Sequence, residues 1–210
     1  MPTAPTAFLA PCVEPLALLV RDWHVDGKLD EDDLERALTA RARAWVDGVC
    51  EAQAAIPPED VETLVALVAE QLGGEAALSD LAGEIATGWL LRAPFEGLLR
   101  AARPLPDGPG FVVSQAAEWL AVRPDWSYSG GRDGFEVRLE GLAAASPALK
   151  AYFGGLLARL SRASLPRDRS LDWRIEGVDG GALVVSAVVE SGPGGGAGEQ
   201  SRLRRAALVP

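Results

Sequence analysis

The stretch DWSYSGGRDGFEVRLE, residues 125–140, decides the fold class of this chain. From Phe135 to Glu140 its side chains alternate between apolar and charged, the period of two that is typical of a strand with one buried face. The preceding segment 130–134 is a glycine-rich turn sequence. The stretch therefore predicts a β-hairpin.

A second hairpin is predicted downstream, with a helix in between. Residues 171–176 alternate again, Asp179-Gly180-Gly181 is a turn sequence, and residues 182–190 are almost all apolar. Between the hairpins, Ser146-Pro147 opens a helical pattern that continues to about residue 162. The C-terminal half therefore predicts the order β-β-α-β-β.

Upstream of the first hairpin the pattern is helical. A long helix is predicted from about Asp32, because apolar residues recur there at spacings of three and four up to Val49. Further helices are predicted over residues 58–72, 75–92, 95–102 and 112–122, and the apolar segment 16–20 favours helix, whereas residues 1–12 are expected to be irregular. The predicted fold class is α+β, an N-terminal helical layer followed by a β-β-α-β-β four-stranded antiparallel sheet.

Three regions follow from these patterns. Residues 1–43 form an N-terminal extension with an acidic turn and the start of the first long helix. Residues 44–190 form an α+β domain of ligand-binding type, and residues 191–210 a glycine-rich linker with a basic tail.

Composition excludes several classes of function. The 210 residues carry 20 Lys and Arg against 30 Asp and Glu, a formal net charge of −10, which argues against nucleic acid and against an anionic membrane surface as partners. Two cysteines, Cys12 and Cys50, do not make a disulfide framework, and no apolar run approaches the ~20 residues that span a bilayer. We therefore expect a cytoplasmic protein.

A resemblance extends over residues 44–190. It rests on Trp45, on Ile56-Pro57-Pro58-Glu59-Asp60 with Leu64-Val65-Ala66-Leu67, on Leu81-Ala82-Gly83 with Gly88-Trp89-Leu90 and Pro94-Phe95, and on Phe135-Glu136-Val137-Arg138-Leu139 with Ala151-Tyr152-Phe153-Gly154-Gly155-Leu156-Leu157. These patterns resemble an uncharacterised myxobacterial paralogous family of about this length. The order of elements resembles the superfamily of haem-nitric-oxide-binding domains, TRAPP-type trafficking subunits and four-vinyl-reductase-type ligand-binding domains. The resemblance implies an apolar cavity for a small molecule or a protein-docking face, and no activity.

Haem is the cofactor that some members of this superfamily bind, through a histidine on a helix before the sheet. The single histidine here, His24, lies near the N-terminus, far from that helix. The run Tyr128-Ser129-Gly130-Gly131-Arg132 resembles the haem family's Tyr-x-Ser-x-Arg motif, but it falls one strand too early and Gly130 replaces the serine. We therefore expect no cofactor, and interpret this run as a polar hairpin.

An acidic segment, residues 22–33, partly matches a calcium-binding loop. Asp22, Asp26, Gly27, Asp30 and Asp33 fall at positions where an EF-hand places oxygen ligands or its glycine. His24 stands where a hard cation needs oxygen, so an acidic turn that caps the next helix is the favoured interpretation and calcium binding a minor alternative. One histidine and two distant cysteines do not make a zinc site.

Neither a catalytic centre nor a phosphate loop is predicted. The chain has no Gly-x-Ser-x-Gly elbow, and residues 192–198 lack the Gly-Lys-Ser/Thr of a phosphate loop. We therefore expect a non-enzymatic binding module, a carrier or sensor of a small apolar ligand. The alternative is a TRAPP-like scaffold that binds another protein, as a homodimer or within a complex.

The candidate pocket centres on two glycines that interrupt the apolar helix of residues 146–162. Gly154 and Gly155 each cost about 1 kcal/mol in a helix relative to alanine, so a close neighbour or a ligand must justify them. The alternatives are tight helix packing and a pocket wall faced by tryptophans on other helices. The predicted pocket residues are Trp89, Trp119, Phe153, Gly154, Gly155 and Leu157.

Overall fold

The computed structural model describes residues 7–8, 10–49, 56–90, 95–122, 126–131, 133–140, 145–165, 169–178 and 182–191. The helices are α1 (Ala10–Val25), α2 (Glu31–Ala37), α3 (Ala40–Val46), α4 (Pro58–Leu72), α5 (Glu75–Leu90), α6 (Phe95–Ala102), α7 (Gly108–Leu120) and α8 (Pro147–Arg162). The strands are β1 (Ala7–Phe8), β2 (Ala121–Val122), β3 (Trp126–Gly131), β4 (Gly134–Glu140), β5 (Arg169–Val178) and β6 (Ala182–Ser191). No helix of this described part is long and apolar enough to cross a membrane.

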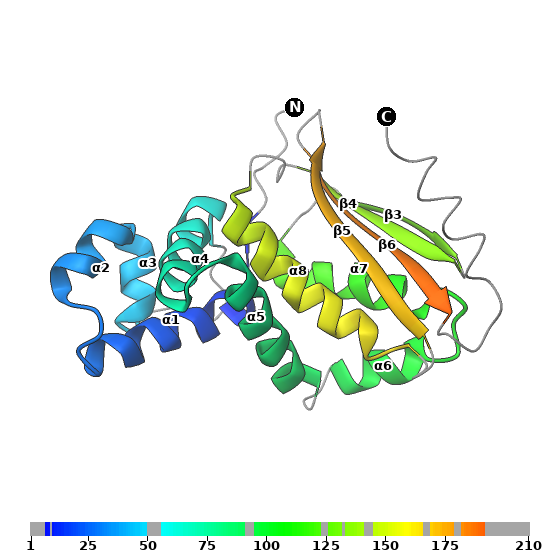
Figure 1. Ribbon diagram of the computed structural model, residues 1–210, viewed down its shortest axis with the longest axis horizontal. Coiled ribbons are helices and arrows are strands. Elements are labelled where there is room, and N and C mark those ends of the chain that lie inside the picture. The colour runs from blue at the N-terminus through cyan, green and yellow to red at the C-terminus, as the bar shows by residue number, and fades with distance from the viewer. Residues whose placement is uncertain are drawn as a thin grey trace.

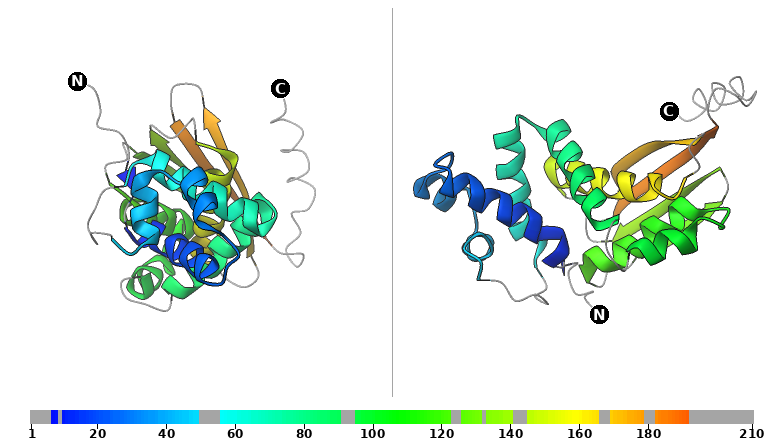
Figure 2. Two further views of the ribbon diagram at one scale, coloured as in Figure 1. Left: turned by 90° about the vertical axis from the view of Figure 1, so that its left-hand side faces the viewer. Right: turned by 90° about the horizontal axis from the view of Figure 1, so that it is seen from below.

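The C-terminal half is an antiparallel sheet with the strand order β3-β4-β6-β5. Helix α8 connects β4 to β5 and lies with α7 on one face of the sheet (Figures 1 and 2). Val137 of β4 pairs with Val185 of β6, and both side chains are buried beneath the helices, whereas Glu136 and Val188 are exposed. The predicted α+β fold class and the β-β-α-β-β order are confirmed.

Helices α1 to α4 gather at the end of the molecule remote from the sheet and join it through α8 (Figure 1). The hydroxyl of Tyr152 on α8 donates to the carbonyl oxygen of Cys12 on α1, at 2.7 Å, and both residues are fully buried. The rings of Phe8 and Phe153 lie 5.1 Å apart. One hydrophobic core thus extends from the first helix to α8.

The prediction of one long helix from Asp32 was wrong. The chain breaks at Leu38, which is extended with φ −107° and ψ 145°, so that α2 and α3 are separate short helices. Thr39 causes the break: its hydroxyl oxygen accepts from the Ala42 N–H at 3.1 Å, as an N-cap of α3, and its hydroxyl donates to buried Asp60 at 2.6 Å. The apolar spacing continues across this break, which is why it predicts a continuous helix.

The expectation of an irregular N-terminus was also wrong within the described part. Helix α1 begins at Ala10, and the two-residue strand β1 pairs with β2, Phe8 opposite Ala121. The helix predicted over residues 112–122 runs from Gly108 to Leu120 and gives way to β2. Strands of two residues show no readable period in a sequence. The turn predicted at residues 179–181 and the segment 192–210 lie outside the described residues.

Candidate functional site

A groove opens where α5, α8 and the edge strand β5 meet. Its volume is about 470 Å³. The residues that line it are Glu75, Ala76 and Ser79 of α5, Lys150, Ala151, Gly154 and Ala158 of α8, and Arg174 and Ile175 of β5. Most of this lining is apolar, with ionisable side chains contributed by all three elements.

Gly155 sets how closely α5 and α8 approach beneath this groove. A Cβ atom at this position would collide with the carbonyl oxygen of Ser79 and lie 2.9 Å from the Cβ of Ala82. Gly155 is buried, so the backbone of α5 occupies the space that any side chain would need. This close approach accounts for a glycine at position 155.

Gly154 faces the groove itself. A Cβ atom there would lie 2.9 Å from the Cδ1 atom of Ile175, at the end of a flexible side chain. Ala151, Gly154 and Ala158 share one face of α8 because they are three and four residues apart, and all three are half-buried. These small side chains leave the floor of the groove concave.

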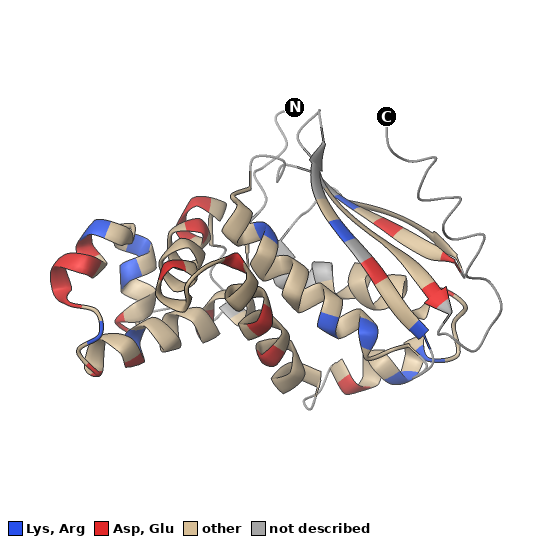
Figure 3. Ribbon diagram, viewed as in Figure 1, with Lys and Arg blue, Asp and Glu red and all other residues tan. Residues whose placement is uncertain are grey.

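Among the described residues that line the groove, two are basic and one is acidic. Lys150 of α8 is half-buried, whereas Arg174 of β5 and Glu75 of α5 are exposed. Within the described part of the chain, no ion pair joins either cation to an acidic side chain. Helix α8 carries no acidic residue, and Figure 3 shows basic positions along it while acidic positions are frequent on α2, α4 and α5.

The structure brings only part of the predicted pocket to this groove. Gly154 lines it, whereas Phe153 and Leu157 are buried in the core and Gly155 packs against α5. Trp89, half-buried at the end of α5, stacks on Phe95 with ring centroids 5.7 Å apart. Trp119 belongs to α7, and its side chain lies outside the described residues.

Sequence reasoning missed the charged residues of the groove and, apart from Gly154, its small residues. The small side chains of Ala151, Gly154 and Ala158 on one helix face were the available signal. Lys150 and Arg174 are 24 positions apart in the chain and meet the same groove only because α8 packs beside β5. No local spacing could have paired them.

The acidic segment 22–33 acts as a helix cap, as the favoured interpretation predicts. The Asp30 carboxylate accepts from the Asp33 N–H at 2.7 Å, and the Asp33 carboxylate accepts from the Asp30 N–H at 3.2 Å, which is a capping box at the start of α2. Lys28 pairs with Asp26 at 3.7 Å. Among the described residues, no three His, Cys, Asp or Glu side chains gather where they could hold a metal ion.

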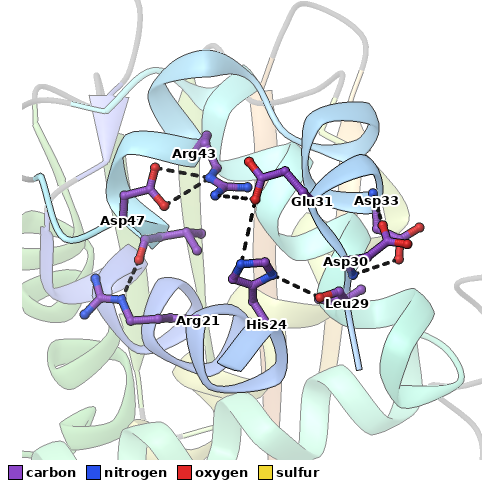
Figure 4. A network of polar contacts seen from close by, with 9 residues as sticks. Arg21, His24, Leu29, Asp30, Glu31, Asp33, Arg43 and Asp47 are labelled. Carbon is purple, nitrogen blue, oxygen red and sulfur yellow. Dashed lines mark hydrogen bonds and ion pairs between the residues drawn. The ribbon is translucent and has the colours of Figure 1, made fainter. Parts of the chain in front are cut away.

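His24 belongs to a network that joins α1 to α2 and α3 (Figure 4). Its Nδ1 atom lies 3.0 Å from the carbonyl oxygen of Leu29, and its Nε2 atom lies 3.7 Å from a carboxylate oxygen of Glu31. The same carboxylate accepts from Arg43 at 3.0 Å, and Arg43 also donates to Asp47 at 3.0 Å. The contacts of the single histidine are thus structural and remote from the groove.

The fold is similar to two solved structures of H-NOX proteins. One is a point mutant of the protein from T. tengcongensis, with a TM-score of 0.50 and 17% identity over 86% of this chain and 97% of that chain. The other is the Fe(II) unliganded protein from K. algicida, with a TM-score of 0.53 and 13% identity over 87% of this chain and 97% of that chain. No family model and no curated protein matches the sequence. At sequence identities this low, the structural similarity shows the fold alone.

The described residues do not fit a haem ligated as the resemblance implies. Helix α7, which precedes the sheet, has no histidine, and His24 is held by Leu29 and Glu31. Tyr128 donates its hydroxyl to the carboxylate of Asp107 at 2.7 Å, and burial together with this bond raises the tyrosine pKa. Burial likewise raises the pKa of the Cys12 thiol, which disfavours the thiolate that would bind iron.

Proposed function

We propose that this protein is a non-enzymatic binding module that holds a small apolar ligand in the groove between α5, α8 and β5. The observation that carries the proposal is the groove itself. Its volume of about 470 Å³ is within the range of small-molecule sites, and its concave floor is apolar. Ala151, Gly154 and Ala158 form that floor, and the side chain of Ile175 closes it at the edge strand.

The chemistry of the lining supports binding over catalysis. Ser79 and Glu75 are the hydroxyl and the carboxyl among the described residues that line the groove, and these residues include no imidazole or thiol. A serine nucleophile needs a base within hydrogen-bond reach, and His24 lies in the separate network of α1 to α3. The groove thus offers a surface for a ligand without an activated nucleophile.

A neutral solvatochromic dye tests this proposal. Nile red should bind the wild-type protein saturably, with one site and a blue-shifted emission. Ala151→Leu should weaken binding by about tenfold or more, because the added side chain fills the floor and loses the burial of several methylene groups. Ala66→Leu, at an exposed position on α4, is the matched control and should bind as wild type. Equal binding by both variants would contradict the proposal.

Protein interaction is a second candidate function, favoured by the face of the sheet that no described helix covers. On β6 the side chain of Val188 is 55% exposed on the face away from the helices, next to half-buried Ser186. Within the described part of the chain, the edge strand β5 pairs with β6 alone, over ten residues. Sedimentation velocity should then detect a dimer that Val188→Lys dissociates, while Val25→Lys, at a 78% exposed position on α1, leaves it intact. A monomeric wild type argues against self-association.

A further inference from the structure

We propose that the ligand of the groove is an alkyl carboxylate, with its chain on the apolar floor and its head group bound by Lys150 and Arg174. This inference rests on the proposed function and adds the chemical class of the ligand. It follows from the charges that line the groove and from the shape of the floor between them.

Two basic residues that have no acidic partner in the described part of the chain line the groove together in this acidic protein. The basic side chains with acidic partners are Lys28, Arg36, Arg41, Arg43 and Arg100. Among the described residues, Lys150 and Arg174 have no such partner. The same is true of Arg21, Arg103, Arg159, Arg162 and Arg169, but those five lie outside the groove, whereas Lys150 and Arg174 line it together. Half-burial of Lys150 beside apolar side chains strengthens its attraction for an anion, since the local dielectric constant is lower than in bulk water.

The balance of charge favours a head group with one negative charge. Among the described residues that line the groove, two are basic and one, Glu75, is acidic, so these residues together carry a single net positive charge. The Arg174 guanidinium can donate two parallel hydrogen bonds to a carboxylate, and the Lys150 ammonium adds a point charge. Glu75 would repel a second negative charge on the ligand, and the described lining has no third cation to neutralise that charge.

The floor matches an extended alkyl chain of medium length. Lys150 and Ala158 lie two turns apart on α8, which corresponds to about 12 Å along the helix. Ala151 and Gly154 lie between them on the same side, so an alkyl chain placed along α8 contacts small apolar groups over its whole length. Decanoate is therefore a suitable probe, and decanol is its neutral counterpart.

The test is displacement of bound Nile red by decanoate and by decanol, each below its micelle-forming concentration. In Lys150→Gln/Arg174→Gln the inhibition constant of decanoate should rise about tenfold or more, because a hydrogen bond to a charged group contributes at least that factor. The constant of decanol should stay within about twofold of wild type. Arg162→Gln, which removes an exposed cation of α8 outside the groove, is the matched control and should change neither constant.

Decyl phosphate distinguishes the class of head group. At about pH 8, where a phosphate monoester carries two negative charges, it should displace Nile red more weakly than decanoate. A stronger effect of decyl phosphate would overturn the assignment of a carboxylate.

Equal loss of decanoate and decanol binding in the double variant would overturn the role of the two cations, while the groove would stand as an apolar site. Absence of Nile red binding by the wild type, together with no heat of decanoate binding by calorimetry, would overturn both the inference and the proposed function.

Discussion

Gly154 and Gly155 are neighbours in α8 with opposite surroundings. The position of a Cβ atom at residue 155 is occupied by the backbone of α5, at the carbonyl of Ser79, whereas the same atom at residue 154 would meet only the end of the Ile175 side chain. A rigid backbone cannot move aside, but a terminal methyl group can. The two glycines therefore have different roles, one in helix packing and one at the groove.

This contrast predicts different effects of one added methyl group. Gly155→Ala should lower the free energy of unfolding by about 1–3 kcal/mol, the usual cost of overpacking a core. Gly154→Ala should change it by about 1 kcal/mol or less, since the alanine gains helix propensity as Ile175 moves. Urea unfolding of both variants measures the difference. Equal stabilities would show that α5 and α8 are not in backbone contact at Gly155.

The thiol of Cys12 and the phenol groups of Tyr128 and Tyr152 are buried or half-buried, and they predict a loss of stability in alkaline solution. Burial raises the pKa values of Cys12 and Tyr152, and burial with the Asp107 bond raises that of Tyr128. The unfolded chain loses these protons first, so their contribution is complete at neutral pH and is lost as the pH rises above about 9. Urea unfolding between neutral and alkaline pH should show this decline, with a smaller slope in Tyr128→Phe. A constant free energy of unfolding over that range would contradict these environments.

At the scale of the element, the break between α2 and α3 depends on Thr39. Its hydroxyl bonds both to the Ala42 N–H and to Asp60, which is buried and also pairs with Arg41 at 3.3 Å. Thr39→Ala should lower the free energy of unfolding by about 1–2 kcal/mol, through loss of the cap and of a hydrogen bond to a charged group. Thr39→Ser keeps the hydroxyl and should retain most of the stability. Thermal melting of the two variants compares them, and equal losses would refute the capping role.

Much of the fold could be predicted from the sequence, because long elements have clear periods and caps. Ser146-Pro147 opens α8 with the Ser146 hydroxyl oxygen accepting from the Leu149 N–H, as the sequence indicates. The break at Thr39 could not be predicted, because it depends on Asp60, which is 21 positions away and lies on another helix. The groove was predicted only at Gly154, since Arg174 reaches it through the packing of β5 beside α8.

On the scale of the whole molecule, the last pair of the sheet places Ser191 opposite Arg169. The segment 192–210 has large apolar side chains only at Leu203, Leu208 and Val209, so we expect that truncation after Ser191 leaves the folded domain intact. The melting temperature of the truncated protein should be within about 2 °C of that of the full chain, which corresponds to less than 1 kcal/mol for a domain of this size. A larger decrease would show that the C-terminal segment contributes to the fold.

The groove between α5, α8 and β5 is the central claim, and alanine methyl resonances test it most directly. With alanine methyl groups labelled by carbon-13, addition of decanol should shift the resonances of Ala76, Ala151 and Ala158, which line the groove, because the ligand changes their surroundings. The methyl group of Ala66, on the exposed side of α4, should not shift. Shifts at Ala66 but not at the three groove alanines, or no shift at any alanine, would contradict binding in this groove.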